Sequence, residues 1–168
     1  MRTPFALLIA AALAGCAKDA PPPAPPAPPK MVEETIPDAR FCARPAEKTA
    51  FDVAAMKTRL MIAALSCGGT PQYNGFISRN RQALVAQEKA LALYFTRNYG
   101  RRGQAEQDDY ITALANLQAQ RRTRDTDAFC KDTASLFEDV AKVKAPAELV
   151  AVAGAKPVNQ PMNVALCP

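Results

Sequence analysis

The 168-residue sequence contains no histidine and no tryptophan. Histidine is the commonest general base and the commonest metal ligand in proteins near neutral pH. Nucleophile systems that pair serine or cysteine with histidine are therefore excluded within this chain. We expect no metal site and no cofactor, because closely spaced cysteine pairs of the zinc-binding kind are lacking as well.

Other catalytic motifs are missing too. Serine occurs only at Ser66, Ser78 and Ser135, and none of the three lies in a G-x-S-x-G or S-x-x-K motif. A Walker loop and a G-x-G-x-x-G loop are also absent from the sequence. Paired carboxylates could support glycoside chemistry, but we interpret the candidates as charges at helix ends and on a solvated face. They are Glu106, Asp108, Asp109, Glu138 and Asp139.

The first residues show the pattern of an export signal. One positive charge, on Arg2, precedes an apolar run over residues 5–13 that is too short to be a transmembrane helix. This run ends in the segment Leu13-Ala14-Gly15-Cys16. We predict that residues 1–15 are a signal peptide; the alternative for the segment is an ordinary signal peptide followed by a chance cysteine.

The segment resembles the lipobox of bacterial lipoproteins, in which Leu-x-Gly/Ala precedes an acylated cysteine. The resemblance implies cleavage before Cys16, diacylglycerol on its sulfur and usually a third acyl chain on the new amino group. Each buried methylene contributes about 0.8 kcal/mol, so two or three chains anchor a protein firmly where one chain holds only marginally. Ala17 stands where aspartate would retain a lipoprotein at the inner membrane, so the resemblance favours the outer membrane, facing the periplasm.

A run rich in proline and alanine follows over residues 21–29. Proline has a fixed φ and no N–H to donate, so the run predicts polyproline II conformation. At about 3.1 Å per residue it would span roughly 28 Å. We interpret residues 16–40 as the lipid anchor and a disordered, semi-rigid linker. A proline-rich ligand for a partner domain or for the cell wall is the alternative.

Four cysteines lie in the remaining domain, residues 41–168. An even number in an exported chain indicates two disulfides, because the periplasm is oxidising. Metal binding is the alternative, but none of the four forms a close pair. They are Cys42, Cys67, Cys130 and Cys167.

This domain has the pattern of an all-α protein, with abundant alanine and with apolar residues at helical spacing. Gly68-Gly69 and Gly100 indicate helix ends, and Thr70-Pro71 indicates a helix start. We predict a disulfide-linked bundle of about four helices, with one further short helix over 148–153. The four helices are expected over residues 47–67, 71–99, 104–122 and 126–144.

The order of these helices predicts the disulfide pairing. In an up-down-up-down bundle the first and fourth helices are neighbours. Cys67 ends the first helix and Cys130 lies near the start of the fourth, so both lie at one end of the bundle. Cys42 and Cys167 lie at the other end. Of three possible connectivities we therefore predict the nested one, Cys42–Cys167 with Cys67–Cys130.

Arginine clusters at two predicted helix links, in a chain with a net charge of +5. Such clusters could bind anionic lipid headgroups, lipopolysaccharide phosphates or an acidic protein. The alternative is that they complement the dipoles of helix C-termini. Nucleic acid is not an expected partner of an exported chain. The candidates are Arg97, Arg101 and Arg102 at one link and Arg121, Arg122 and Arg124 at the other.

Residues from about 65 to 130 resemble uncharacterised alphaproteobacterial proteins, in elements such as Tyr73-Asn74, Tyr99-Gly100 and the run from Thr112 to Asn116. The resemblance points to no particular activity and implies only that the domain is not unique to this chain. We expect a non-enzymatic lipoprotein that presents a helical interaction domain to an envelope partner, in an accessory or assembly role. A periplasmic small-ligand or inhibitor-type binding protein is the alternative, and a carboxylate-based hydrolase is the least favoured hypothesis.

Overall fold

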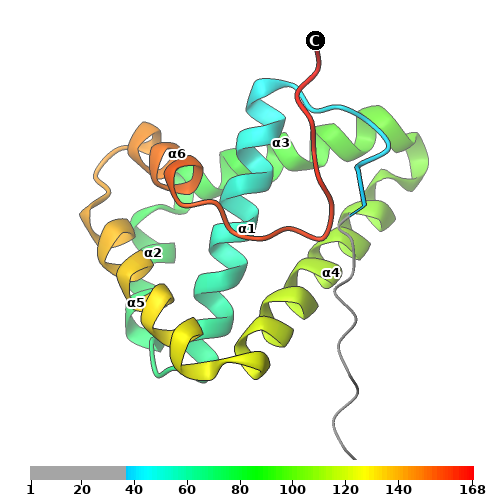
Figure 1. Cartoon of the computed structure of the whole chain (residues 1–168). Coiled ribbons are helices and arrows are strands. Elements are labelled where there is room, and N and C mark those ends of the chain that lie inside the picture. Colours follow the sequence, from blue (N-terminus) through cyan, green and yellow to red (C-terminus); the bar gives the residue numbers. More distant parts are fainter. Residues whose placement is uncertain (1–36) are drawn as a thin grey trace, which may run out of the picture. The chain divides into compact units, whose positions relative to one another are not determined.

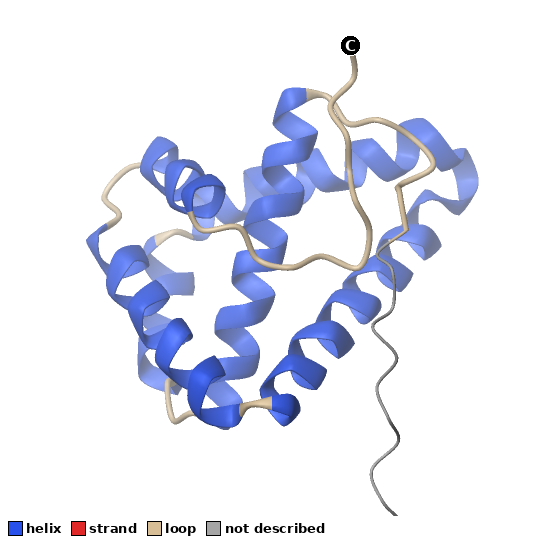
Figure 2. Cartoon of the chain, in the orientation of Figure 1, coloured by secondary structure: helices blue, strands red, loops and turns tan. Residues whose placement is uncertain are grey.

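A computed structural model describes residues 37–168, so the predicted signal peptide and most of the predicted linker lie outside the described residues. In the described part the only extended pairing is two isolated bridges, and all regular elements are helical (Figure 2). The all-α prediction is confirmed. The elements are α1 Pro45–Ser66, α2 Thr70–Arg79, α3 Arg81–Tyr99, the 3-10 turn η1 Gly100–Arg102, α4 Gly103–Arg124, α5 Thr126–Lys142 and α6 Pro146–Ala155.

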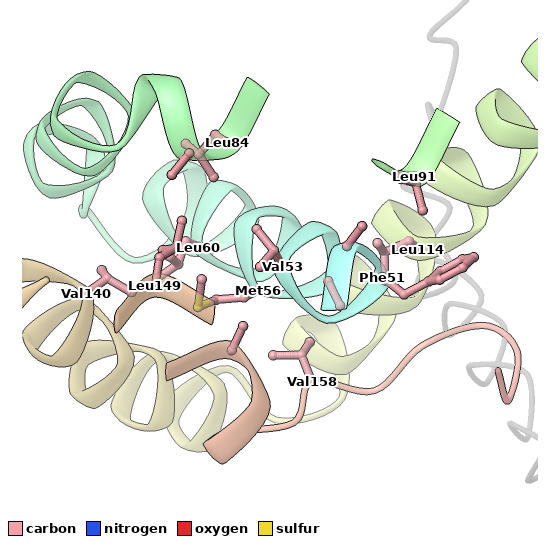
Figure 3. Packing of buried hydrophobic residues seen from close by; sticks show 14 of the residues in the cluster. Phe51, Val53, Met56, Leu60, Leu84, Leu91, Leu114, Val140, Leu149 and Val158 are labelled. Atoms are coloured by element: carbon pink, nitrogen blue, oxygen red, sulfur yellow. The ribbon is translucent and has the colours of Figure 1, made fainter. Parts of the chain in front are cut away.

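Helix α1 lies at the centre of the bundle and contacts each of the other five α-helices (Figure 1). Its side chains Phe51 and Leu60 are fully buried. Figure 3 shows Leu84 of α3 on one side of α1, and Val140 of α5 with Leu149 of α6 on the other. A helix that is covered on several sides is a core helix. The predicted helical bundle is confirmed, but α1 occupies its centre and not one corner of a four-membered ring.

The span predicted as one helix, residues 71–99, is divided in the structure. Helix α2 ends at Arg79 and α3 begins at Arg81, with Asn80 buried between them. The Asn80 side chain donates a hydrogen bond to the backbone oxygen of Phe76 at 3.0 Å. Asparagine competes in this way with the hydrogen bonds of the helical backbone, which explains a break that the apolar periodicity does not reveal.

Other helix boundaries follow the local signals. Gly68 comes soon after the end of α1 with a φ of 81°, a conformation that suits glycine. Asp125 caps α5, because its side chain accepts a hydrogen bond from the backbone N–H of Ala128 at 2.9 Å. The short helix predicted over 148–153 is α6, which begins at Pro146, as the fixed φ of proline favours.

Both predicted disulfides are present. The Cα–Cα distances are 4.9 Å for Cys42–Cys167 and 5.7 Å for Cys67–Cys130. The inner bond, Cys67–Cys130, joins the residue after α1 to α5. The outer bond, Cys42–Cys167, joins the segment before α1 to the C-terminal tail.

The outer bond belongs to a structure that we call the terminal clamp, formed by residues 37–43 and 163–167. The two segments run parallel and are joined by two isolated bridges. Their backbones exchange four hydrogen bonds of 2.7–2.9 Å. Within the clamp, Ala43 is completely buried. Residues 37–40, which the sequence predicts as part of the linker, pair here with the C-terminal tail, so the folded part begins before residue 41.

Helix α4 begins against α3 at Gly103, where a side chain has no room. A Cβ there would lie 2.9 Å from the backbone N and Cα of Thr96. We expect Gly103→Ala to lower the free energy of unfolding by about 1–3 kcal/mol, as overpacking does. A Cβ at Gly154 would meet nothing within 4 Å. Gly154→Ala should therefore leave the free energy of unfolding unchanged or raise it by up to about 1 kcal/mol. Urea unfolding followed by circular dichroism compares them, and equal effects would contradict the steric argument.

Candidate functional site

A groove of about 350 Å³ lies between α1 and the helices α2, α3 and α4. Helix α1 supplies one wall with residues at helical spacing, and the other three helices supply the rest. The lining residues are Ala50, Val53, Ala54, Lys57, Thr58 and Met61 of α1, Tyr73 of α2, Leu84, Gln87, Glu88 and Leu91 of α3, and Gln107 and Ile111 of α4.

Small side chains on α1 leave space for this groove. Ala50 and Ala54 lie one helical turn apart on its wall. Beside them, Val53, Leu84 and Leu91 are each at most 5% exposed. Apolar residues at helical spacing indicate the inward face of a helix, and the structure places these three at the groove as well. Concave sites lined mainly by apolar groups are the usual form of ligand sites, so this groove can receive an apolar group.

Polar groups surround the apolar lining. Lys57 of α1 forms an ion pair with Glu88 of α3, with side chains 30% and 54% exposed. Such an exposed pair contributes only about 0–1 kcal/mol to stability, so an incoming partner could replace it at little cost. Gln87 carries a buried side-chain oxygen that has no hydrogen-bond partner among the described residues. A donor on an occupant could satisfy this oxygen.

Tyr73 also lines the groove. Burial raises the pKa of Tyr73, and the charge of Glu88 raises it further while that of Lys57 lowers it. The hydroxyl therefore stays protonated at neutral pH and can donate a hydrogen bond. It is not suited to act as a general base, which requires a pKa near the working pH.

The carboxylates considered for glycoside chemistry do not line this groove. Glu106 pairs with Arg102 at the surface. Asp139 pairs with Lys156, and this hydrogen bond is the main reason why the pKa of Asp139 is lowered. A general acid needs a raised pKa, so Asp139 has the opposite environment. The remaining candidates, Asp108, Asp109 and Glu138, are exposed.

The two arginine clusters lie toward opposite ends of α4. This helix has 22 residues and so a length of roughly 33 Å at about 1.5 Å per residue. One small anion therefore cannot contact both clusters. In the first cluster Arg97 pairs with Glu47 and Arg102 pairs with Glu106, while Arg101 is exposed. In the second cluster Arg121 and Arg122 are half-buried and Arg124 is exposed.

Glu47 and Arg97 form an ion pair that the sequence pattern does not indicate. The Glu47 side chain is 7% exposed and that of Arg97 is 30% exposed. Arg97 also donates to the backbone oxygen of Cys42 at 3.2 Å. Nearby, the Tyr94 hydroxyl donates to the backbone oxygen of Phe41 at 2.8 Å. Helix α3 thus holds the terminal clamp against the start of α1.

Within residues 37–168 there is no group of three or more metal-ligating side chains that could hold an ion. No helix in this part of the chain has the length and apolar character needed to cross a bilayer. The sequence matches no family model, no curated protein and no solved structure.

Proposed function

We propose that the chain is a non-enzymatic lipoprotein of the bacterial cell envelope, anchored by lipid on Cys16 and facing the periplasm. The two disulfides support export, because disulfides persist in oxidising compartments and are rare in the cytosol. The predicted lipobox and linker, which lie outside the described residues, support anchoring. Ala17 favours the outer membrane as the address.

The groove between α1 and the helices α2, α3 and α4 carries the proposal of a binding role. Helical bundles bind partner segments by burying a few apolar side chains in such a groove. The proposed occupant is an apolar segment of an envelope protein, for which this chain acts as an accessory or assembly factor. Polar groups on that segment would meet Lys57 and Glu88, while its apolar side chains would lie against Leu84 and Leu91.

The groove's size favours a second candidate function, the binding of a small apolar ligand. Ligand pockets commonly have volumes of about 300–1,000 Å³, and this groove, at about 350 Å³, falls within that range. The Gln87 oxygen and the Tyr73 hydroxyl would then supply the polar contacts that orient the ligand.

Filling the groove should abolish binding of the partner. Ala54 lies half-buried in its wall, so Ala54→Phe would place an aromatic ring in the space; Ala119→Phe adds the same ring at an exposed position of α4. A photo-crosslinking residue replaces Ile111 at the groove in the full chain in cells. We expect a crosslinked adduct with one envelope protein. Its yield should be unchanged by Ala119→Phe and should fall at least tenfold in Ala54→Phe.

An adduct that is insensitive to Ala54→Phe would contradict the proposed occupant. The second candidate predicts a different result with the same variants. The full chain in detergent would then bind small apolar compounds, detected as a rise in thermal midpoint. That rise would be present in Ala119→Phe and lost in Ala54→Phe, with no protein adduct in cells.

Cys16→Ser should release the protein from the membrane, because it removes the sulfur that takes the lipid. We expect the variant to lose incorporation of labelled palmitate and to leave the membrane fraction. Ala17→Asp is the matched control, which should keep the label and move the protein from the outer to the inner membrane. If the Cys16→Ser protein stays membrane-bound and labelled, lipid anchoring at Cys16 is wrong.

A further inference from the structure

Arg59 of α1 is a mostly buried cation whose acidic partner, Asp132, is exposed. Its side chain is 12% exposed, and its Nε donates to the Thr133 hydroxyl of α5 at 3.2 Å. The guanidinium lies over the ring of Phe129, 5.2 Å from the ring centre. Its acidic neighbour, Asp132, is 3.6 Å from a terminal nitrogen and 68% exposed. Helix α5 therefore orients Arg59 and supplies its acidic partner, Asp132, whose side chain is largely exposed to solvent.

Most of the hydrogen-bond donors of Arg59 are unused. A guanidinium has five N–H donors. The Nε–H of Arg59 bonds to Thr133, and one terminal nitrogen faces Asp132 at 3.6 Å, which leaves donors of the other terminal nitrogen for a further acceptor. Arg97 differs, because its Nε donates to a Glu47 carboxylate oxygen at 3.0 Å and its NH2 nitrogen donates to the other. A mostly buried charge is stabilised by close pairing, and the pair of Arg59 with the exposed Asp132 is longer than that of Arg97 with Glu47. Arg59 thus has the capacity to bind an anion from outside the chain.

A hollow of about 340 Å³ adjoins this side chain, between α1, α5 and the residues that follow α6. Ser135 and Lys156 line it together with Arg59. The Lys156 ammonium donates to the Ser135 hydroxyl at 3.1 Å, so these two groups already lie together. The Lys156 ammonium also pairs with Asp139, which does not line the hollow. The hollow therefore brings together a guanidinium, an ammonium and a hydroxyl, with Asp132 as the only acid in its lining.

A second guanidinium increases the positive charge near the hollow. Burial is the main cause that lowers the pKa of Arg59, and the charge of Arg121, near the end of α4, is the next, while Asp132 opposes both. Like charges that lie close together repel. An anion bound beside Arg59 would offset this repulsion. Electrostatic attraction would therefore favour the binding of an anionic ligand here.

We propose that this hollow binds a phosphate group, with the Arg59 guanidinium donating to two phosphate oxygens and with Ser135 and Lys156 completing the contacts. The planar fork of arginine matches phosphate geometry, and lysine adds a point charge. A lipid headgroup and free phosphate share this chemistry. The site does not overlap the groove, so it stands independently of the proposed function.

Calorimetric titration of the full chain, in maltoside detergent at low salt, tests the proposal with inorganic phosphate. We expect saturable binding that weakens at least tenfold in Arg59→Gln and several-fold in Lys156→Gln. Arg101→Gln removes an exposed positive charge remote from the hollow and should stay within twofold of the native affinity. Because Arg59 also packs on Phe129, Lys156→Gln tests the site without disturbing that contact, and thermal midpoints verify folding.

Dihexanoyl phosphatidic acid, a soluble lipid, distinguishes the source of the phosphate in the same titration. Tighter binding of this lipid than of inorganic phosphate, with the same sensitivity to Arg59→Gln, identifies a headgroup. Tighter binding of inorganic phosphate identifies a soluble ligand. No saturable binding of either compound, or equal weakening by Arg59→Gln and Arg101→Gln, overturns the proposal.

Discussion

Replacing Cys42 and Cys167 by serine should lower the free energy of unfolding by roughly 4 kcal/mol and open the terminal clamp. The outer bond spans 125 residues, but the inner bond spans 63 of them and shortens the loop that is closed. A remaining loop of about half the full span contributes roughly 4 kcal/mol in the chain-entropy model. Urea unfolding in oxidising buffer measures this loss.

Hydrogen exchange of the clamp amides measures the opening of the clamp separately from global unfolding. The backbone amides of Ala39, Ala43, Asn163 and Cys167 donate its four hydrogen bonds. Without the outer bond, we expect these amides to exchange hydrogen much faster than those in the middle of α1. The reason is that local opening then requires only backbone hydrogen bonds to break, whereas exchange in α1 requires more of the domain to unfold.

Cys67→Ser with Cys130→Ser is the matched control for this experiment. It removes a bond that closes 63 residues, so the global loss should again be roughly 4 kcal/mol. The inner bond lies between α1 and α5, away from the clamp, so the four clamp amides should remain comparatively protected. Clamp amides that stay as protected as α1 after loss of the outer bond would show that the bond does not hold the clamp closed.

The cysteine pairing was predictable because it depends only on helix order. Four cysteines placed at helix ends leave one nested pairing for antiparallel neighbours, and the exact packing angles do not matter. The central position of α1 was not predictable in this way. Periodicity identifies inward positions such as Val53 and Leu60, but it does not reveal how many partners surround the helix. The break between α2 and α3 at Asn80 was not predicted, because the helical spacing of apolar residues continues through it.

The candidate site was less accessible to sequence reasoning than the fold. The groove exists because Ala50 and Ala54 on α1 face longer side chains across a helix interface, and that juxtaposition depends on tertiary packing. The same holds for Arg59 and Thr133, which come together from α1 and α5. A sequence cluster such as Arg121-Arg122 indicates a candidate site, whereas Arg59 is the only arginine of α1 and stands among apolar and charged residues without any motif.

Arg97→Ala should be more destabilising than Glu47→Gln, although both remove the same ion pair. Arg97→Ala leaves the buried Glu47 carboxylate without its cation. We expect this variant to lower the free energy of unfolding by about 2 kcal/mol. This is less than the roughly 3–5 kcal/mol typical of a fully buried pair, because the Arg97 side chain is 30% exposed. Glu47→Gln leaves a cation that water can reach, with an expected loss of about 1 kcal/mol. The exposed pair of Arg102 and Glu106 provides the control: Arg102→Ala should change stability by less than about 1 kcal/mol.

The pH dependence of these variants gives the sharper test. Burial raises the pKa of Glu47, but hydrogen bonds from Arg97 and from the Arg44 backbone outweigh it, so the pKa lies below its ordinary value of 4.5. The stability that ionised Glu47 contributes is therefore full above pH 4.5 and is lost as the pH falls through the lowered pKa. In Arg97→Ala the effect of burial remains while the Arg97 contacts are gone, so protonation relieves the stranded carboxylate. The cost of Arg97→Ala should consequently shrink as the pH falls from neutral, whereas a cost that is constant with pH would show that Arg97 acts through packing on Tyr94 and not through its charge.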